Sequence, residues 1–192
     1  MKKSGRFVFG VVLALGLAGV VSAKKVEGVK LDETKTLAGQ TLTLNGAGLR
    51  TATVLKVRLY VASFYATQKI QTEADVLAAQ GPLRFDFVFL RAFPKNKVED
   101  AWRWQFKQSG TKTYDGYEND VEAFATAFGP IAKGGVETVE LEGDETRIYD
   151  DGVLRGSVKG RDFQKAFLGL WFGTKPVMPS LKAALLGKEG KH

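Results

Sequence analysis

One arginine follows two glycines and precedes a long apolar run. Arg50 comes after Gly46 and Gly48, and residues 54–65 are mainly apolar and aromatic. The two closely spaced glycines predict a tight backbone turn beside the arginine. Arginine keeps its charge and presents five donors in a planar fork, which suits it to hold a carboxylate or another oxyanion. The pattern predicts an anion site at the mouth of an apolar pocket, and an exposed arginine after a surface turn is the alternative.

The composition removes several classes of chemistry. The chain has no cysteine, and its single histidine is His192 at the end. A Ser-His-Asp triad, a thiol nucleophile and a histidine-based zinc site therefore cannot be built. We expect no metal and no cofactor, so any catalysis would use Arg, Tyr, Lys, carboxylates or water. The net charge of +7 is spread along the chain without a basic cluster, so we expect no nucleic acid partner.

The first 23 residues have the layout of a secretory signal peptide. Cations precede an apolar run over residues 7–21, which ends in the small-residue sequence Val-Ser-Ala. This run is shorter than the roughly 20 residues that span a bilayer, although an uncleaved membrane anchor is the alternative. We predict a periplasmic protein with at most transient membrane contact, in which residues 24–192 form one domain.

Hydrophobic periodicity and turn residues predict the elements that must position the arginine. Strands are expected at residues 26–30, 40–44, 54–65, 83–90, 136–141, 146–149 and 153–158. Helices are expected at residues 72–80, 96–108, 118–128, 161–172 and 181–186. Thr72 is a predicted helix cap, and Asn96 and Glu99 have the spacing of a capping box. The chain has no linker, so we predict an α+β fold with helices mainly on one face of an antiparallel sheet.

Aromatic side chains on these elements are expected to form the walls of the pocket. Tyr60 and Phe64 share one face of the strand at residues 54–65, and Phe87 lies on the aromatic face of the next strand. Trp102 and Gln105 share one face of the helix at residues 96–108. Ordinary core packing is the alternative for each aromatic residue taken alone.

Three blocks of sequence, taken in order, resemble the chalcone isomerase-like family, and specifically its bacterial exported branch. The blocks are residues 44–50, residues 56–65 and the ending from Gly160 to Leu181. The resemblance covers nearly all of residues 24–192. It implies an open-faced β-sandwich, in which helices cover a large antiparallel sheet and the ligand cleft lies between them.

The resemblance keeps only part of the plant enzyme's site. Arg50 matches the arginine that holds the phenolate oxygen of the substrate in that enzyme. Four further polar positions of the enzyme fall on Tyr60, about Val98, about Gln105 and about Leu170. Catalysis by positioning and electrostatic stabilisation does not keep its rate when most donors are lost. The resemblance therefore does not imply chalcone cyclisation.

The family's fatty-acid-binding members resemble this pattern better. In them an arginine and a tyrosine hold the lipid carboxylate, and the resemblance assigns these roles to Arg50 and Tyr60. We predict an exported, non-catalytic binder of a small amphipathic acid, either fatty-acid-like or aromatic. The predicted ligand-binding residues are Arg50, Tyr60, Phe64, Phe87, Trp102 and Gln105.

Two other functions remain open. One is an intramolecular lyase or isomerase of chalcone isomerase type on an unknown substrate, with Arg50 as electrophile and Tyr60 as acid. The other is an envelope interaction protein with a vestigial cleft. Trp102 and Trp104 lie on different faces of one predicted helix, so one of them should point away from the core and mark a contact surface.

Overall fold

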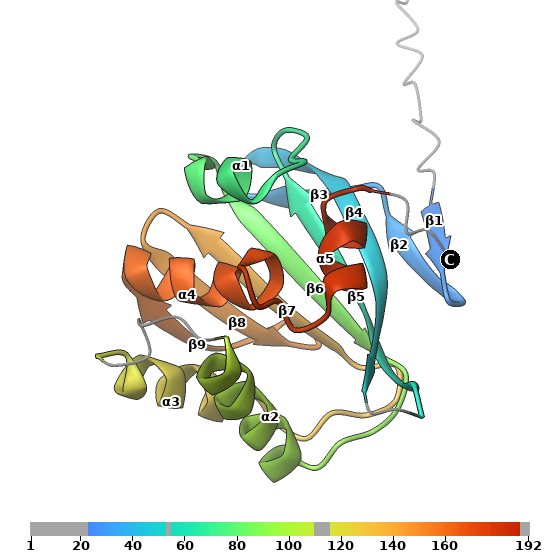
Figure 1. The fold of residues 1–192 in the computed structure, drawn as a ribbon, viewed down its shortest axis with the longest axis vertical. Helices are drawn as coiled ribbons and strands as arrows, with labels where there is room; N and C mark the ends of the chain where they lie inside the picture. The colour runs from blue at the N-terminus through green and yellow to red at the C-terminus, as the bar shows by residue number, and fades with distance from the viewer. Residues whose placement is uncertain (1–22, 53–54, 110–115, 189–192) are drawn as a thin grey trace, which may run out of the picture.

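A seven-stranded antiparallel sheet forms the centre of the fold (Figure 1). The computed structural model describes residues 23–52, 55–109 and 116–188. Within them the strands lie side by side in chain order from β3 to β9. Their bounds are Thr34–Leu37 (β3), Gln40–Ala52 (β4), Val57–Ala66 (β5), Leu83–Phe89 (β6), Val136–Glu142 (β7), Glu145–Asp150 (β8) and Val153–Lys159 (β9). A separate hairpin of β1 (Ala23–Val26) and β2 (Val29–Asp32) precedes the sheet.

Helices cover one face of this sheet, as Figure 1 shows. Among the described residues they are α1 (Glu73–Ala78), α2 (Lys95–Gln108), α3 (Glu118–Ala127), α4 (Arg161–Phe172) and α5 (Pro179–Leu185). α5 packs over β4, and α3 packs over β9. The predicted α+β arrangement is confirmed. None of these helices is long and apolar enough to cross a membrane, and the predicted signal peptide lies outside the described residues except for Ala23.

The core between the sheet and the helices is mainly aromatic. Alternation along β6 directs Phe85 and Phe87 toward the helices, where both are buried. The Phe85 and Phe167 ring centroids lie 5.3 Å apart, and those of Phe87 and Trp171 lie 5.2 Å apart. Such pairs contribute about 0.5–1.5 kcal/mol each beyond the area that they bury. They hold α4 against the middle of the sheet.

The predicted turn at Gly46 and Gly48 is wrong, because β4 continues through both residues with only a register shift between Leu44 and Gly46. A Cβ atom on Gly46 would overlap the backbone carbonyl oxygens of Ala184 and Leu185. A Cβ atom on Gly48 would lie 2.7 Å from the Cβ of Ala184. The glycines are therefore needed for the close approach of α5. Arg50 lies within the strand rather than beside a turn.

Two further sequence predictions differ from the structure at element ends. The strand expected at residues 26–30 is interrupted by a turn at Glu27 and Gly28, which have φ values of 52° and 88°. α2 begins at Lys95 after Pro94, and no side chain caps it. The capping box predicted at Asn96 is therefore wrong, because the helix has already begun there. The cap predicted at Thr72 is confirmed, since its hydroxyl accepts a hydrogen bond from the Asp75 amide.

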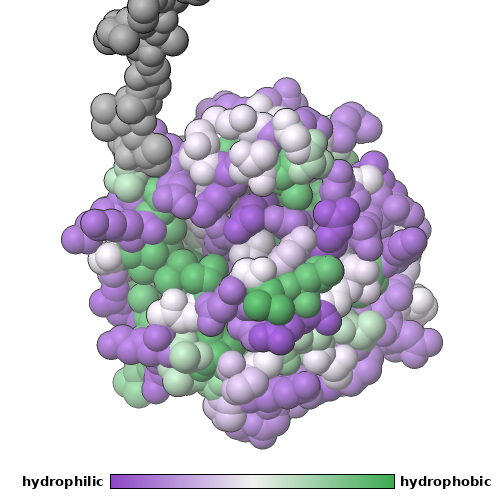
Figure 2. All heavy atoms as spheres, turned by 180° about the vertical axis from the view of Figure 1, so that it is seen from behind, coloured by the Kyte–Doolittle hydropathy of each residue, from purple (hydrophilic) through white to green (hydrophobic). Residues whose placement is uncertain are grey.

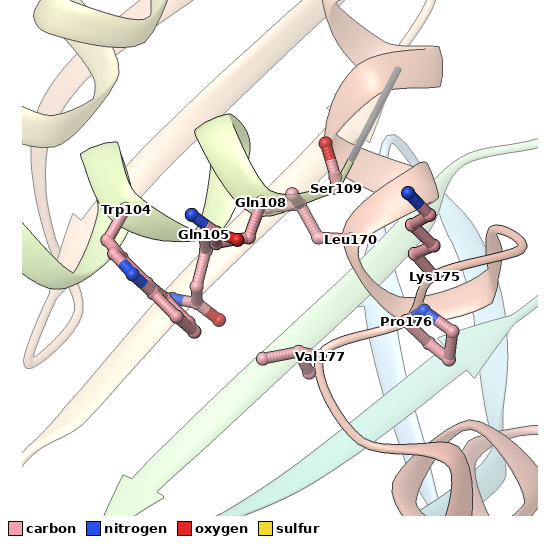
Figure 3. Close-up of a pocket in the computed structure, with 8 residues that line it drawn as sticks. All are labelled: Trp104, Gln105, Gln108, Ser109, Leu170, Lys175, Pro176 and Val177. Carbon is pink, nitrogen blue, oxygen red and sulfur yellow. The ribbon is translucent and has the colours of Figure 1, made fainter.

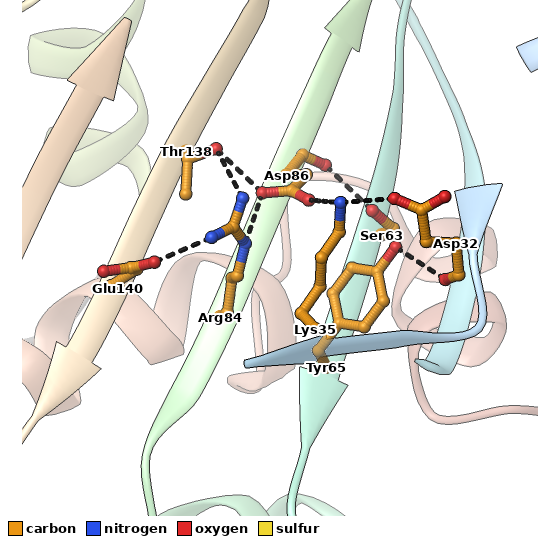
Figure 4. Close-up of polar contacts among 8 residues, drawn as sticks. All are labelled: Asp32, Lys35, Ser63, Tyr65, Arg84, Asp86, Thr138 and Glu140. Carbon is orange, nitrogen blue, oxygen red and sulfur yellow. Dashed lines mark hydrogen bonds and ion pairs between the residues drawn. The ribbon is translucent and has the colours of Figure 1, made fainter. Parts of the chain in front are cut away.

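The opposite face of the sheet carries a polar network, drawn in Figure 4. Arg84 pairs with Asp86 at 2.8 Å and with Glu140 at 2.7 Å. The Thr138 hydroxyl donates to Asp86 at 2.8 Å, and Lys35 lies 3.8 Å from the same carboxylate. Figure 2 views the molecule from this side, where hydrophilic side chains surround smaller apolar patches. The buried carboxylates of this network all have partners.

Candidate functional site

A cavity of about 340 Å³ lies between the sheet and α2. Its volume falls within the range of about 300–1,000 Å³ that is typical of small-molecule sites. Strands β4 to β7 form one wall, and α2 forms most of the other. The lining is mainly apolar: Ala52, Leu59, Tyr60, Phe87, Phe89, Phe93, Lys97, Val98, Ala101, Trp102, Gln105 and Glu137.

Local backbone features explain why these side chains converge. The pairing between β4 and β5 shifts between Arg50 and Thr51, which leaves Leu59 as an extra residue opposite this step. A bulge of this kind redirects side chains, and Leu59 lines the cavity together with Tyr60. The lining positions of α2 are 97, 98, 101, 102 and 105, which is one face of a helix.

Tyr60 is the residue that connects the cavity to Arg50. It lies directly opposite Arg50 on β4 and opposite Phe89 on β6. Its ring centroid is 5.4 Å from that of Phe87 and 5.2 Å from that of Phe89. Burial raises the pKa of Tyr60 well above its usual value, while the nearby Arg50 guanidinium acts in the opposite direction. Tyr60 therefore presents a neutral hydroxyl that can donate a hydrogen bond.

Arg50 is half-buried beside this hydroxyl. Its guanidinium donates to the carbonyl oxygen of Thr51, and Nη1 lies 4.0 Å from the Met178 sulfur. Among the residues that the structure describes, no carboxylate pairs with Arg50. Its charge is thus available to an anion held next to Tyr60.

Lys97 supplies a second cation, which we did not predict from the sequence. It is exposed in the first turns of α2 and lines the cavity. Within the described ranges it forms no ion pair. The sequence could have indicated its place at the cavity, because Lys97 directly precedes Val98 on the helix that was expected to line the pocket.

Glu137 is a buried acid in the cavity wall, and the sequence reasoning missed it. It is only 1% exposed, and neither carboxyl oxygen has a hydrogen-bond partner among the described residues. Burial, followed by the nearby Asp150 carboxylate, raises the pKa of Glu137 well above that of an ordinary glutamate. Alternation with Val139 and Leu141 could have revealed it, because this pattern puts an acid on the apolar face of the strand.

Gln105 lies between the cavity and a smaller groove of about 150 Å³, shown in Figure 3. Its buried Oε1 atom has no partner among the described residues. Trp104, Lys175 and Val177 are among the other residues of this groove. Trp104 is 56% exposed and Trp102 only 4% exposed, so the tryptophan that points away from the core is Trp104.

The structure brings together most of the residues that the sequence singled out. Tyr60, Phe87, Trp102 and Gln105 all line the cavity, and Arg50 lies beside Tyr60. Phe64 does not line it. This ring is fully buried in the core, 4.8 Å from the Phe85 ring and 5.2 Å from the Phe172 ring. Ligand binding by the six predicted residues stays a prediction.

Three positions that the resemblance matches to polar residues of the plant enzyme are apolar or amide here. Val98 and Gln105 line the cavity, and Leu170 is buried beside the smaller groove. In the described part of the chain, no group of three or more His, Asp or Glu side chains could hold a metal ion. The cavity lining offers a phenol, an ammonium, an amide and a buried carboxyl group, and the Arg50 guanidinium lies outside the lining, beside Tyr60.

The chain is similar to known proteins both in sequence and in fold. A family model described as chalcone isomerase-like matches residues 23–187. The crystal structure of an Arabidopsis thaliana fatty-acid binding protein is similar, with a TM-score of 0.69 and 15% sequence identity, over 86% of this chain and 96% of that chain. No protein of curated function matches the sequence. Because the family model matches nearly the whole folded part, the chain belongs to the chalcone isomerase-like family.

Proposed function

We propose that this protein binds a small amphipathic acid without transforming it. The acid group would lie against Arg50 and Tyr60, and the apolar body would fill the cavity between β6 and α2. The observation that carries the proposal is the pairing of a neutral phenol in the cavity wall with an arginine that has no carboxylate partner among the described residues.

Both parts of the site favour such a ligand. A carboxylate on Arg50 and Tyr60 would accept charge-assisted hydrogen bonds, which are roughly twice as strong as neutral ones. Burial of about 200 Å² of ligand in the apolar walls would contribute about 5 kcal/mol before the costs of association. Lys97 at the cavity adds a favourable electrostatic field for an anion.

The structural comparison indicates which acid to test first. The similar Arabidopsis thaliana protein is a fatty-acid binding protein, so we take a fatty acid as the starting ligand. The sequence of residues 1–23 supports export, and we propose that the ligand is met in the periplasm. Edman sequencing of protein recovered from a periplasmic extract should begin at Lys24, whereas a start at Met1 would contradict the proposed location.

Calorimetric titration with dodecanoic acid tests the proposed function. Replacing Arg50 by alanine should weaken binding by about tenfold or more, because the charged hydrogen bonds to the carboxylate are lost. Arg58→Ala is the matched control, since Arg58 lies outside the cavity and pairs with Glu27 at 2.6 Å. Equal affinities of the wild type and Arg50→Ala would refute the proposal.

A further inference from the structure

Glu137 differs from the other buried acids of the sheet. Glu140, three positions along the same strand, pairs with Arg84, and Asp86 pairs with Arg84 as well. Glu137 faces the cavity, where no described residue hydrogen-bonds to its carboxyl oxygens. A buried polar group without a partner is costly to the folded protein. An apolar residue at this position would pack against Phe87 at no such cost.

The groups around Glu137 define what it can offer. Asp150 lies opposite it on β8, and Tyr60 on β5 is close enough for the two groups to interact electrostatically. α2 contributes Lys97 and Gln105 to the same cavity. Burial and the Asp150 charge favour the protonated form of Glu137. The protonated carboxyl group can donate one hydrogen bond, and the amide oxygen of Gln105 can accept one.

A hydroxyl group is complementary to this pair of side chains. Its oxygen can accept from a protonated carboxyl group, and its proton can be donated to an amide oxygen. A plain hydrocarbon chain would leave both side chains unsatisfied in a desolvated site. Sites that hydrogen-bond a ligand hydroxyl reject analogues without it far more strongly than apolar pockets reject an added group.

We propose that Glu137 and Gln105 recognise a hydroxyl group in the apolar body of the ligand, so that the preferred ligand is a hydroxylated amphipathic acid. This inference rests on the proposed function, because it assumes that the acid group lies at Arg50 and Tyr60. The two ends of the site would then recognise different groups of the ligand. Arg50 and Tyr60 select an acid, and Glu137 and Gln105 select among acids.

The test compares dodecanoic acid with monohydroxydodecanoic acids that carry the hydroxyl at successive carbons. Calorimetric titration of the wild type should find at least one positional isomer that binds about tenfold more tightly than dodecanoic acid. Glu137→Leu should abolish or reverse this preference, because it removes the donor and fills the wall with apolar atoms. Glu137→Gln should keep part of the preference, since an amide can also donate.

Thr146→Val is the matched control. Its hydroxyl is also buried and without a hydrogen-bond partner among the described residues, but Thr146 does not line the cavity. This variant should keep the preference of the wild type. Circular dichroism establishes that each variant is folded. If Glu137→Leu does not fold, the test uses Glu137→Gln, whose side chain has nearly the same shape as that of the wild type.

Two results would overturn the inference. One is a wild type that binds dodecanoic acid more tightly than every hydroxylated isomer, and the other is a preference that Glu137→Leu leaves unchanged. In both cases binding of dodecanoic acid that depends on Arg50 would still support the proposed function. Failure of every acid to bind would overturn both proposals together.

Discussion

Replacement of Glu137 by glutamine should change how the stability of the protein depends on pH. In the folded protein, burial raises the pKa of Glu137, so the carboxyl group binds its proton more tightly there than in the unfolded chain. The contribution of Glu137 to stability is therefore greatest below the ordinary glutamate pKa, about 4.3, and falls as the pH rises toward the raised value. Glutamine does not titrate, so the variant lacks this contribution.

The size of the effect follows from proton linkage. For as long as the pH lies between the two pKa values, the free energy of unfolding of the wild type falls by about 1.4 kcal/mol per pH unit relative to the variant. Each pH unit in that interval therefore removes a measurable share of the stability of an ordinary domain, which is about 5–15 kcal/mol.

Urea denaturation followed by tryptophan fluorescence measures the effect, since Trp102 and Trp171 are buried. Glu122→Gln is the control, because Arg103 holds the pKa of this exposed acid below its usual value. The wild type should lose stability relative to that control as the pH falls, which is the opposite sign. Parallel pH profiles of the wild type and Glu137→Gln would refute the reasoning about the buried carboxyl group.

Three further variants test other parts of the account. Gly46→Ala should destabilise the protein by about 3 kcal/mol, because the added Cβ atom would overlap the α5 backbone at Ala184 and Leu185. Urea denaturation measures this loss, and an unchanged midpoint would contradict the packing of α5 on β4. Tyr60→Phe should lower the affinity for dodecanoic acid several-fold in calorimetry through the lost hydroxyl, and equal affinity would count against Tyr60. Thr72→Ala should cost about 1 kcal/mol of stability, because α1 loses its N-terminal cap. Thermal unfolding measures this loss, and an unchanged midpoint temperature would show that the cap contributes nothing to stability.

The sequence predicts β5 to β9 and the five described helices because their signals are local, but it misses β3 and all but the start of β4. Alternating residues identify β6 through Phe85 and Phe87, and the Asp151-Gly152 turn identifies the hairpin of β8 and β9. The repeat of Val121, Phe124 and Ala125 identifies the buried face of α3. Each signal lies within the element itself and does not depend on a distant partner.

The role of Gly46 could not be predicted in the same way. A glycine allows either a tight turn or the close approach of another backbone segment, and the sequence pattern is the same in both cases. The deciding contact comes from α5, at Ala184 and Leu185, which are far away in the chain. Similarly, the environment of Glu137 depends on α2, which lines the same cavity. Its residue type was visible, but the lack of a partner is a property of the packed structure.

The pairing of Arg50 with Tyr60 was predicted, whereas the composition of the cavity around them was predicted only in part. The family resemblance linked the two residues, and the register of β4 and β5 places them directly opposite each other. Phe64 shares the strand face of Tyr60, but α4 covers it through Phe172. Which aromatic residues line a cavity depends on where the helices lie.

A crystal structure of the protein with dodecanoic acid tests the central claim most directly. We predict that the carboxylate lies about 3 Å from both the Arg50 guanidinium and the Tyr60 hydroxyl, with the hydrocarbon chain between Phe87 and Trp102. A carboxylate bound elsewhere, for example on Lys97 alone, or a chain lying outside the cavity would contradict the account.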